Sequence, residues 1–578
     1  MINLKINNVP VQVEAGTTIL EAAKSIGIKI PTLCYLKEIN AIGACRICVV
    51  EVKGMRNLVA SCVYPVAEGM EVFTNSERVL KSRKTTLELI LSNHKKDCLS
   101  CDRNTNCELQ KLSYEYNCDC HKYSGVMCDE PQDTSTEYLI RDNTKCVLCR
   151  RCVAVCNKTQ GIGVIGANER GFATHIGTAF DMNLSNTPCI GCGQCVTVCP
   201  TGALVEKDGL TRVKEALANP NKHVVVGSAP SVRAALGEEF GNPIGINVEG
   251  KMVRALHLCG FDKVFDVNCA ADFTIMEEAT ELIGRIQNGG TLPMFTSCCP
   301  GWINYIEHNY GDLLPHLSSC KSPQNMFGAL IKHVYAQQNG IDPADVYVVS
   351  VMPCTAKKGE KLRTFTDGLA DVDAVLTTRE LARLIKTNGL DFNNLPSEVM
   401  DRPFGEYTGA ALLFGATGGV MEAALRTASE MLGGDPSADI EFKQVRGQKG
   451  IKKATYTING ITVKVAVVNG IKQAQEICEQ IRAGKADYHF VEVMTCPGGC
   501  VNGGGQPVAP DFNSDKATLI SKRANVLYKG DKGMHNRTSH TNAAVIAVYE
   551  EFFGKPNTGK AHKLLHTTYT AKPKFIKE

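Results

Sequence analysis

Cysteine supplies most of the chemically distinctive side chains in this sequence. The chain has 27 cysteines, and 18 of them lie in the first 199 residues, often two or three residues apart. The clearest pattern is an internal repeat, Cys-x2-Cys-x2-Cys-x3-Cys, at 146–156 and again at 189–199. It predicts two 4Fe-4S clusters, because in such pairs the fourth cysteine of each run binds the other cluster. The predicted sets are Cys146, Cys149, Cys152 and Cys199 for one cluster, and Cys189, Cys192, Cys195 and Cys156 for the other.

Two further ligand sets precede this repeat. The first, Cys34, Cys45, Cys48 and Cys62, predicts a 2Fe-2S cluster on the loops of a small sheet, with structural zinc as the alternative. The second, His94, Cys98, Cys101 and Cys107, would suit zinc equally well in isolation, but the neighbouring clusters favour a 4Fe-4S cluster. A neutral imidazole ligand should raise the reduction potential of that cluster. Four such centres indicate an electron relay, whereas Cys118, Cys120 and Cys128 fit no complete set and are expected on loops.

A second group of cysteines lies far along the chain, after the relay. TSCCPGW at 296–302 contains the adjacent Cys298 and Cys299, whose side chains should point to opposite sides of an extended segment. One could bind a metal while the other faces a separate chamber, although core packing of both thiols is also possible. Cys354, Cys496 and Cys500 each lie beside Pro or Gly at the end of an apolar run. Together with Cys299 they could hold one more cubane.

Local patterns predict the elements that position these residues. Residues 2–6 and 9–13 should form a hairpin, followed by a short helix that Thr18 caps, and 77–93 should be helical. From Val224 onward, strands alternate with helices as in an α/β domain. A buried strand within 224–233 should lead to a helix at Ser231, whose free amides would favour an anionic ligand.

A later helix is expected from about 271 to 286, with Thr274 and Glu277 as its capping box. Glu278, Glu281 and Arg285 form a polar stripe on it. A solvated surface with a Glu281–Arg285 ion pair and a proton path are both consistent with this stripe.

Composition excludes several classes of protein. The chain has 63 Lys and Arg against 60 Asp and Glu, which argues against a generally basic nucleic-acid or membrane-surface binder. The N-terminus lacks the apolar core of a signal peptide, and no apolar run is long enough to span a membrane. We therefore expect a soluble cytoplasmic protein, and a disulfide framework is disfavoured because it needs an oxidising compartment.

Three signatures resemble those of iron-only (FeFe-type) hydrogenases, specifically the large, monomeric, ferredoxin-dependent kind. They are TSCCPGW at 296–302, MPCTAKKGE at 352–360 and EVMTCPGGCVNGGGQP at 492–507. The resemblance covers nearly the whole chain and implies a fold class: an α/β catalytic domain preceded by small α+β ferredoxin-like modules. The expected domains are a β-grasp 2Fe-2S domain (1–78), a His/Cys3 4Fe-4S segment (79–125), a bacterial ferredoxin-like domain with two 4Fe-4S clusters (126–208), and a catalytic domain with a small-subunit-like C-terminal segment (209–578).

The resemblance also implies an active site, a cubane joined through one cysteine to a two-iron centre with carbon monoxide, cyanide and an azadithiolate bridge. The implied cubane ligands are Cys299, Cys354, Cys496 and Cys500, with Cys500 as the bridge. Lys357 would donate to one cyanide, and the Ala229–Pro230–Ser231 backbone with the Ser231 hydroxyl to the other. Gln324, Met352, Phe414 and Met494 would line the pocket, although ordinary core roles stay open.

Proton transfer is implied through Cys298, with Arg285, Glu281, Ser318 and Glu278 leading to it. Thr495, where the family commonly has Ala, places a hydroxyl beside Cys496, and Cys320 is expected to fill the core. The implied activity is the reversible reduction of protons to H2, with ferredoxin or flavodoxin as electron partner and dedicated maturation proteins to assemble the two-iron centre. The alternatives are an NADH-linked electron-transfer subunit and an iron-sulfur assembly factor.

Overall fold

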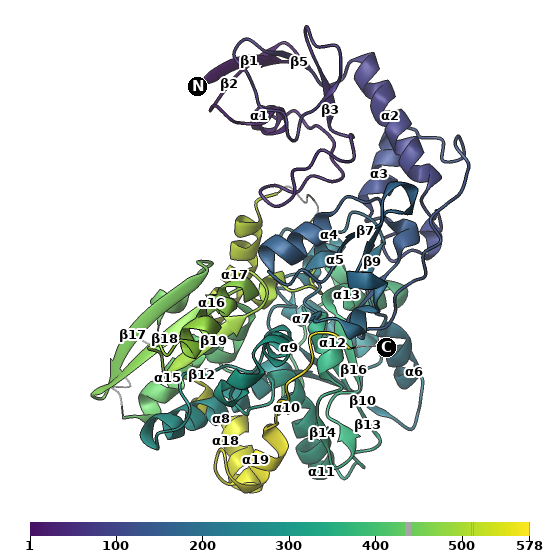
Figure 1. The fold of residues 1–578 in the computed structure, drawn as a ribbon. Coiled ribbons are helices and arrows are strands. Elements are labelled where there is room, and N and C mark those ends of the chain that lie inside the picture. The colour runs from purple at the N-terminus through teal and green to yellow at the C-terminus, as the bar shows by residue number, and fades with distance from the viewer. Residues whose placement is uncertain (434–440, 510, 512–513, 577–578) are drawn as a thin grey trace.

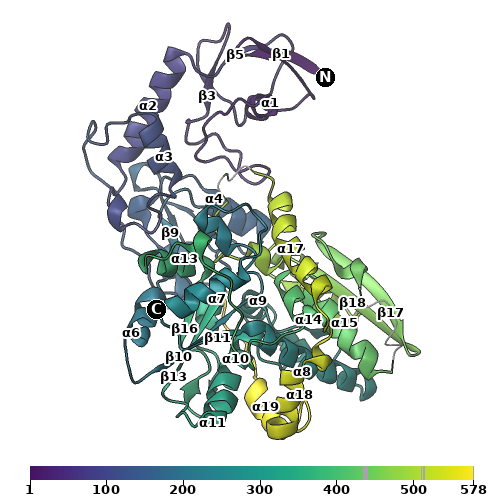
Figure 2. The same cartoon turned by 180° about the vertical axis from the view of Figure 1, so that it is seen from behind.

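The computed structural model describes residues 1–433, 441–509, 511 and 514–576. The N-terminal modules lie at one end of the molecule, and the chain from about residue 210 forms a larger body at the other end (Figure 1). Seen from behind, the first sheet again lies apart from this body, and α2 and α3 lie between them (Figure 2). No helix in the described ranges is long and apolar enough to cross a membrane.

The first module is a five-stranded mixed sheet with one short helix across it. The strand order is β2-β1-β5-β3-β4. Its elements are β1 (Ile2–Ile6), β2 (Val9–Val13), α1 (Ile19–Ser25), β3 (Val49–Val52), β4 (Val59–Ala60) and β5 (Glu71–Phe73). The predicted hairpin is confirmed, and Asn7 and Asn8 supply the two positive φ angles of its turn. Thr18 caps α1 as expected.

Two cluster-bearing segments follow, and most of their elements are short. Their helices are α2 (Glu77–Ser92), α3 (Glu108–Glu115), α4 (Arg151–Ala154) and α5 (Gln194–Val198). Their strands are β6 (Leu139–Arg141), β7 (Gly166–Asn168), β8 (His175–Gly177) and β9 (Leu204–Glu206), paired as β6-β9 and β7-β8. Long loops therefore carry most of the cysteines.

The large body contains two four-stranded sheets, which helices cover. The first sheet is fully parallel, in the order β11-β10-β13-β16: β11 (Lys263–Asp266), β10 (His223–Ser228), β13 (Val346–Met352) and β16 (Ala374–Thr377). The second has the order β12-β19-β18-β17: β12 (Met294–Phe295), β19 (Phe490–Met494), β18 (Ile461–Asn469) and β17 (Ile451–Ile458). Only β17 is antiparallel to its neighbour there. A small hairpin, β14 (Phe365–Thr366) with β15 (Leu369–Ala370), completes the strands.

The helices of this body pack against the sheets or against one another. Those in the first half are α6 (Leu210–Leu217), α7 (Glu249–Leu258), α8 (Val267–Gln287), α9 (Pro300–Asn309), α10 (Pro323–Leu330), α11 (Ala336–Gln338), α12 (Ala356–Glu360) and α13 (Thr378–Thr387). The others are α14 (Gly409–Leu412), α15 (Gly419–Met431), α16 (Ile471–Arg482), α17 (Lys516–Gly533), α18 (Ala543–Val548) and α19 (Gly559–Leu565). The alternation of strands and helices confirms the α/β fold class.

The expected start of α8 is wrong. The helix begins at Val267 and is capped by Asp266, whose side chain accepts from the Asn268 amide. Residues 267–273 contain no Gly or Pro and are buried, so nothing interrupts the helix there. Thr274 consequently lies inside the helix and donates its hydroxyl to the Ala270 carbonyl four residues earlier.

The expected helix at Ser231 is also absent. Turns follow β10, and the next helical element is a short 3-10 helix over Leu236–Phe240. The backbone bond from Val232 to Ala229 spans three residues instead of four. Pro230 between them has no amide to donate.

Candidate active site

A largely apolar cavity with an empty volume of about 830 Å³ lies at the carboxyl ends of parallel strands from both large sheets. The segments after β10, β12, β13 and β19 all reach it, as ligand-binding segments commonly do in open α/β sheets. All predicted cubane and pocket residues line it: Ala229, Pro230, Ser231, Cys298, Cys299, Gln324, Met352, Cys354, Lys357, Phe414, Met494, Cys496 and Cys500. Residues separated by up to 271 positions in the sequence therefore meet in one chamber.

Each of the four cubane cysteines lies on a segment that follows a strand. Cys299 caps α9, with Pro300 in the first helical position, and Cys354 comes two residues after β13. Cys496 and Cys500 flank a turn in which Gly499 has a φ of 94° and its missing Cβ would lie 2.6 Å from the Thr417 nitrogen. Only glycine allows that approach. The chain thus brings four thiols from three loops to one wall of the cavity.

The chemistry of this donor set fits a metal cluster. Burial, assisted by the nearby Cys299, raises the pKa of the Cys354 thiol to about 12. Burial likewise raises the pKa of the Cys496 thiol, with further contributions from Cys354 and Cys192. Clustered thiols in an apolar site are poor acids on their own, but bound iron replaces their protons.

Two polar side chains at the cavity have no partner among the described residues. The Ser231 hydroxyl and both amide atoms of Asn268 are buried without a hydrogen bond. Unpaired buried polar groups are costly, so their position fits a polar ligand group in the cavity. The expected contribution of the Ala229 amide needs correction, because that amide donates to the Val351 carbonyl of β13.

The Lys357 ammonium group lies between the cavity and two acceptors. Its Nζ donates to Glu360 Oε2 at 2.7 Å and to the Cys298 carbonyl at 3.1 Å. Burial opposes the charged form, but Glu360 and the nearby thiols outweigh burial and raise the pKa of Lys357. Glu360 also accepts from Gln324 Nε2 at 3.1 Å, so one carboxylate orients two residues of the cavity wall.

Cys298 lines the cavity, and Glu278 of α8 is near enough for its charge to affect the Cys298 thiol. Glu278 is 1% exposed, and neither of its carboxylate oxygens has a hydrogen bond among the described residues. Burial, assisted by the nearby Glu281, raises the pKa of Glu278 to about 8, against smaller opposing effects of Ser318 and the Ser297 backbone. Burial also raises the pKa of the Cys298 thiol well above its usual range, with Glu278 as the next cause. Both groups therefore hold protons at neutral pH.

Glu281 and Arg285 continue this polar face towards the surface. The Ser318 hydroxyl donates to Glu281 Oε2 at 2.9 Å, and Arg285 Nη2 donates to Glu281 Oε1 at 2.6 Å. Side-chain exposure rises from 10% at Glu281 to 16% at Arg285. The Glu281–Arg285 ion pair of the solvated-surface alternative is present, but the stripe is not a solvated surface, because tertiary packing covers most of it. From Glu278 to Arg285 the face extends about 10 Å along α8, at 1.5 Å per residue.

The eight cysteines of the repeat line two further cavities. One, with an empty volume of about 380 Å³, has Cys146, Cys149, Cys152 and Cys199 in its wall. The other, of about 510 Å³, has Cys156, Cys189, Cys192 and Cys195. The structure therefore groups the cysteines as the crossed ligand pattern predicts.

His94 lies in a dry environment. It is 7% exposed, its Nδ1 has no hydrogen bond within the described ranges, and burial lowers its pKa to about 4. A neutral ring with a free lone pair suits a metal ligand. Cys107 caps α3, and a Cβ on Gly202 would lie 2.5 Å from Cys101 Sγ, so this segment lies against the repeat module.

In the first module, the four cysteines also lie close together. Cys48 Sγ is 3.3 Å from Cys62 Sγ, and a hydrogen bond from Cys45 lowers the pKa of Cys34 to about 7. Asn40 Nδ2 donates to the carbonyls of both Cys34 and Cys149, at 2.8 and 3.0 Å. One side chain thus connects the first cluster segment to the repeat module.

The repeat module also contacts the large cavity. Cys192 lines both its own cavity and the large one. A Cβ on Gly504 would lie 2.3 Å from the Cys192 carbonyl, and the Thr355 hydroxyl donates to the Gly191 carbonyl at 2.6 Å. The proposed last accessory cluster therefore lies directly beside the cubane cysteines.

Comparisons with known proteins agree with this arrangement. The model of the iron-only hydrogenase large subunit, C-terminal domain, matches residues 222–504, and that of the iron hydrogenase small subunit matches 517–572. The chain is 48% identical to the NADP-reducing hydrogenase subunit HndD of Solidesulfovibrio fructosivorans, over 98% of this chain and 99% of that protein. It is 46% identical to Iron hydrogenase 1 of Clostridium pasteurianum, again over 98% and 99%.

The chain belongs to the iron-only hydrogenases. Its structure is also similar to that of the FeFe-hydrogenase HydA1 of Chlamydomonas reinhardtii, with 40% identity and a TM-score of 0.57 over 63% of this chain and 99% of that one. Further matches in this hydrogenase are a 2Fe-2S binding domain (1–77), the iron-sulfur binding region of NADH-ubiquinone oxidoreductase-G (83–121) and a 4Fe-4S dicluster domain (129–203). The protein is thus a hydrogenase of H2 metabolism with accessory iron-sulfur clusters and the active-site cluster of its family.

Sequence reasoning missed two residues at the active site of this hydrogenase. Glu360 ends the second signature one helical turn after Lys357, which was an available signal for an i, i+3 ion pair. Asn268 had no such signal, because the helix was expected to start after it. Thr495, expected beside Cys496, has its hydroxyl 3.2 Å from the Sγ of Cys299 instead.

The cysteines outside the ligand sets are mostly core residues. Cys259, Cys269 and Cys478 are at most 8% exposed and pack in apolar clusters, whereas Cys118 and Cys120 pack only partly buried beside α2 and α3. Cys320 is fully buried too, but polar side chains lie beside it.

Proposed function

We propose that this hydrogenase interconverts H2 with protons and electrons in the large cavity, on a 4Fe-4S cubane held by Cys299, Cys354, Cys496 and Cys500. Cys500 would connect the cubane to a two-iron centre with carbon monoxide, cyanide and an azadithiolate bridge. The observation that carries this proposal is that four thiols and two unpaired polar side chains surround one apolar chamber. When bound, the two-iron centre supplies the position at which two protons and two electrons combine reversibly.

The cavity residues would orient the cyanide groups and exclude water. Lys357, held by Glu360, offers a charged donor towards the cavity, and the Ser231 hydroxyl offers a neutral one. Cyanide is an anionic acceptor, so both donors suit it. Asn268 offers its amide from the opposite element, the first turn of α8. Met352, Phe414 and Met494 provide apolar surface, which strengthens these polar interactions by lowering the local dielectric.

Protons would move along one face of α8. Arg285 lies nearest to solvent, and Glu281 exchanges a proton with Glu278 through the Ser318 hydroxyl, which is hydrogen-bonded to Glu281. Glu278 then exchanges a proton with the Cys298 thiol, which lines the cavity. The raised pKa of Glu278, about 8, lets it hold and release protons near neutral pH.

Electrons would reach the cavity through three accessory 4Fe-4S clusters, one of them with a His94 ligand, and one 2Fe-2S cluster. The contact of Gly504 with Cys192 supports a final step between the repeat module and the cubane. Such centres pass single electrons, so the relay delivers them one at a time to a two-electron reaction.

We propose ferredoxin or flavodoxin as the electron partner. We also propose that the enzyme is monomeric and cytoplasmic. A second candidate is a subunit that exchanges electrons with NADP through partner subunits, because the relative HndD is named a subunit of an NADP-reducing hydrogenase. H2 evolution by the matured chain alone, with reduced ferredoxin or with NADPH, distinguishes these two candidates. H2 evolution with ferredoxin and none with NADPH supports the first, whereas activity with neither carrier, but with a reduced dye, favours the second.

The site is tested by Cys298→Ser, produced together with the maturation proteins. We expect intact infrared bands of carbon monoxide and cyanide but turnover lower by about 10²-fold or more, because serine is a much weaker acid than a thiol. Near-normal H2 evolution from the fully loaded variant would contradict the proton path. Absence of those bands in a correctly matured wild-type protein would contradict the two-iron centre.

A further inference from the structure

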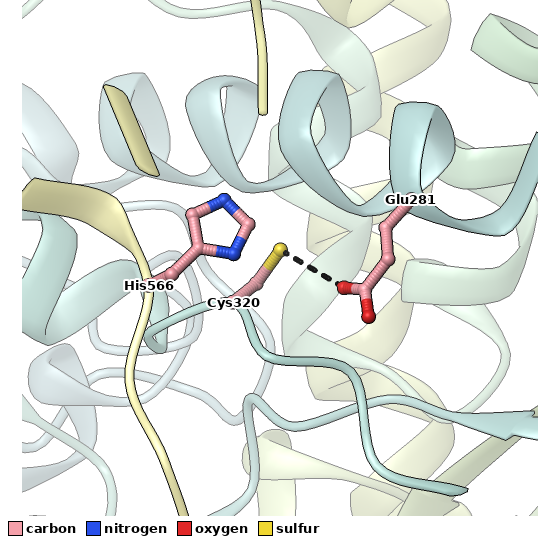
Figure 3. Close-up of side chains that lie close together, drawn as sticks. All are labelled: Glu281, Cys320 and His566. Carbon is pink, nitrogen blue, oxygen red and sulfur yellow. Dashed lines mark hydrogen bonds between the residues drawn. The ribbon is translucent and has the colours of Figure 1, made fainter. Parts of the chain in front are cut away.

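Glu281, on the polar face of α8, lies together with Cys320 and His566 (Figure 3). One potential ligand atom from each lies within 4.8 Å of those from the other two, and Cys320 Sγ is 3.8 Å from Glu281 Oε2. The three residues come from α8, from the segment before α10 and from the residue after α19. A β-bridge between Cys320 and His566 holds the last two in register.

The imidazole of His566 is already oriented as a metal-binding histidine usually is. Its Nε2 lies 3.1 Å from Glu277 Oε2, and the same carboxylate accepts from the Tyr549 hydroxyl and the Asn557 amide. A carboxylate only accepts, so we assign the ring proton to Nε2. Nδ1 then carries a lone pair, which accepts a hydrogen bond from the Ser319 hydroxyl at 2.8 Å and which zinc would take instead. A carboxylate behind the histidine is the usual second partner in zinc sites.

We propose that Glu281 Oε2, Cys320 Sγ and His566 Nδ1 bind a zinc ion, and that the bound ion stops proton transfer through Glu281. One sulfur, one nitrogen and one oxygen donor suit zinc better than magnesium or calcium, which prefer oxygen alone. A fourth position is available to water or to the Ser319 hydroxyl, whose Oγ lies 2.8 Å from His566 Nδ1. A thiolate and a carboxylate balance the two positive charges, so the occupied site is neutral, as a buried site requires.

Zinc binding converts the Cys320 thiol into a bound thiolate and releases one proton to solvent. Burial raises the pKa of this thiol well above its usual value, so the free protein holds the protonated form. The affinity for zinc should therefore increase with pH.

Inhibition is expected because zinc would bind Glu281 Oε2, an oxygen of the proposed proton path. This inference rests on that path. Ser318 donates to Glu281 Oε2, the same atom that faces Cys320. A metal bond to this oxygen removes the acceptor through which Ser318 exchanges a proton. The ion pair of Arg285 uses Oε1 and can persist.

The binding test uses the matured holoenzyme, freed of loose metals, with Zn²⁺ as the only addition. We expect one bound zinc per chain. The extended X-ray absorption fine structure at the zinc edge should show one sulfur at about 2.3 Å and nitrogen or oxygen at about 2.0 Å. Cys320→Ala and His566→Gln should each lose this ion. Cys478→Ala, which removes an equally buried cysteine in α16, should keep it. No stoichiometric zinc in the wild type, or retention of the ion in both Cys320→Ala and His566→Gln, would overturn the site.

The inhibition test measures H2 evolution from a reduced dye, before and after Zn²⁺ and again after a chelator. We expect a loss of about tenfold or more that the chelator reverses, consistent with blocked proton transfer. Cys320→Ala should be active and insensitive to zinc, and the infrared bands should not change. Zinc binding without inhibition would overturn the proposal that zinc stops proton transfer, and it would count against a proton path through Glu281. The zinc site itself would still stand. Equal inhibition of Cys320→Ala would show damage elsewhere and would also overturn the block.

Discussion

Glu278 offers the sharpest test of the proton path, because its buried carboxyl group makes no hydrogen bond to the described residues. Replacing it with glutamine preserves the shape of the side chain but leaves an amide that cannot pass on a proton. We expect Glu278→Gln to lower both H2 evolution and H2 oxidation by about 10²- to 10⁴-fold, the usual contribution of a positioned acid or base.

The magnitude of the pH effect follows from the burial of this group. Its pKa rises from 4.5 to about 8, mainly through desolvation. At about 1.4 kcal/mol per pKa unit, this disfavours the ionised form by roughly 5 kcal/mol. Glu278 can donate a proton below about pH 8 and accept one above it. H2 evolution should therefore decline, and H2 oxidation rise, as the pH increases through about 8.

The raised pKa of Glu278 also determines how the free energy of unfolding changes with pH. Between pH 4.5 and about 8 the folded protein binds this proton more tightly than the unfolded chain does. The contribution of Glu278 to the free energy of unfolding therefore falls as the pH rises through that window. The glutamine variant should lack this component of the pH dependence.

The assay compares matured proteins at equal intensity of their carbon monoxide and cyanide bands, from pH 6 to pH 9. Asp272→Asn is a matched control, since Asp272 is also buried on α8 but is hydrogen-bonded by Thr408 and Asn542 away from the path. The control should keep the transition near pH 8. A fully loaded Glu278→Gln protein with wild-type turnover, or with the same transition, would refute the reasoning.

Three more variants test the electron path. Thr495→Ala removes a hydroxyl that lies 3.2 Å from Cys299 Sγ, so the cubane should lose a hydrogen bond and its reduction potential should fall. A redox titration followed by electron paramagnetic resonance measures this potential. An unchanged potential would contradict the contact. In Gly504→Ala the new Cβ would meet the Cys192 carbonyl and displace the repeat module from the cubane. Stopped-flow measurements on protein with all clusters present should then show slower electron transfer to the active site. Wild-type rates would exclude electron transfer through the contact of Gly504 with Cys192. His94→Cys adds a negative ligand and should lower the potential of its cluster. An unchanged potential would mean that His94 is not a ligand.

Local sequence patterns predicted the elements whose signals lie within a few residues. The hairpin over 2–13 and the helix over Glu77–Ser92 needed only alternation, turn residues and a cap. The same approach failed at α8, where the internal Thr274 and Glu277 imitate a capping box and the true cap is Asp266. It also failed after β10, where the conformation of residues 229–235 depends on contacts with β13 as well as on Pro230.

The candidate site divides in a similar way. Metal-binding cysteines are recognisable because cluster geometry requires short, regular spacing, and the two cavities of the repeat group the cysteines accordingly. The polar face of α8 was ambiguous, because two carboxylates and an arginine at helical spacing look alike on a surface and in a buried path. Packing of the segment at Ser318 against Glu281 shows that this face is largely buried, while its role in proton transfer is our proposal.

The sequence by itself determined the family, the cysteine patterns and the alternation of strands and helices, since each is written in neighbouring residues. Only the tertiary structure decided that Glu278 has no hydrogen-bonding partner among the residues it describes, that Asn268 faces the cavity and that His566 lies beside Cys320 and Glu281. The physical reason is that burial and ligand geometry depend on contacts between distant segments. Glu281 and His566 are 285 residues apart in the chain, and no local pattern reports the distance between them.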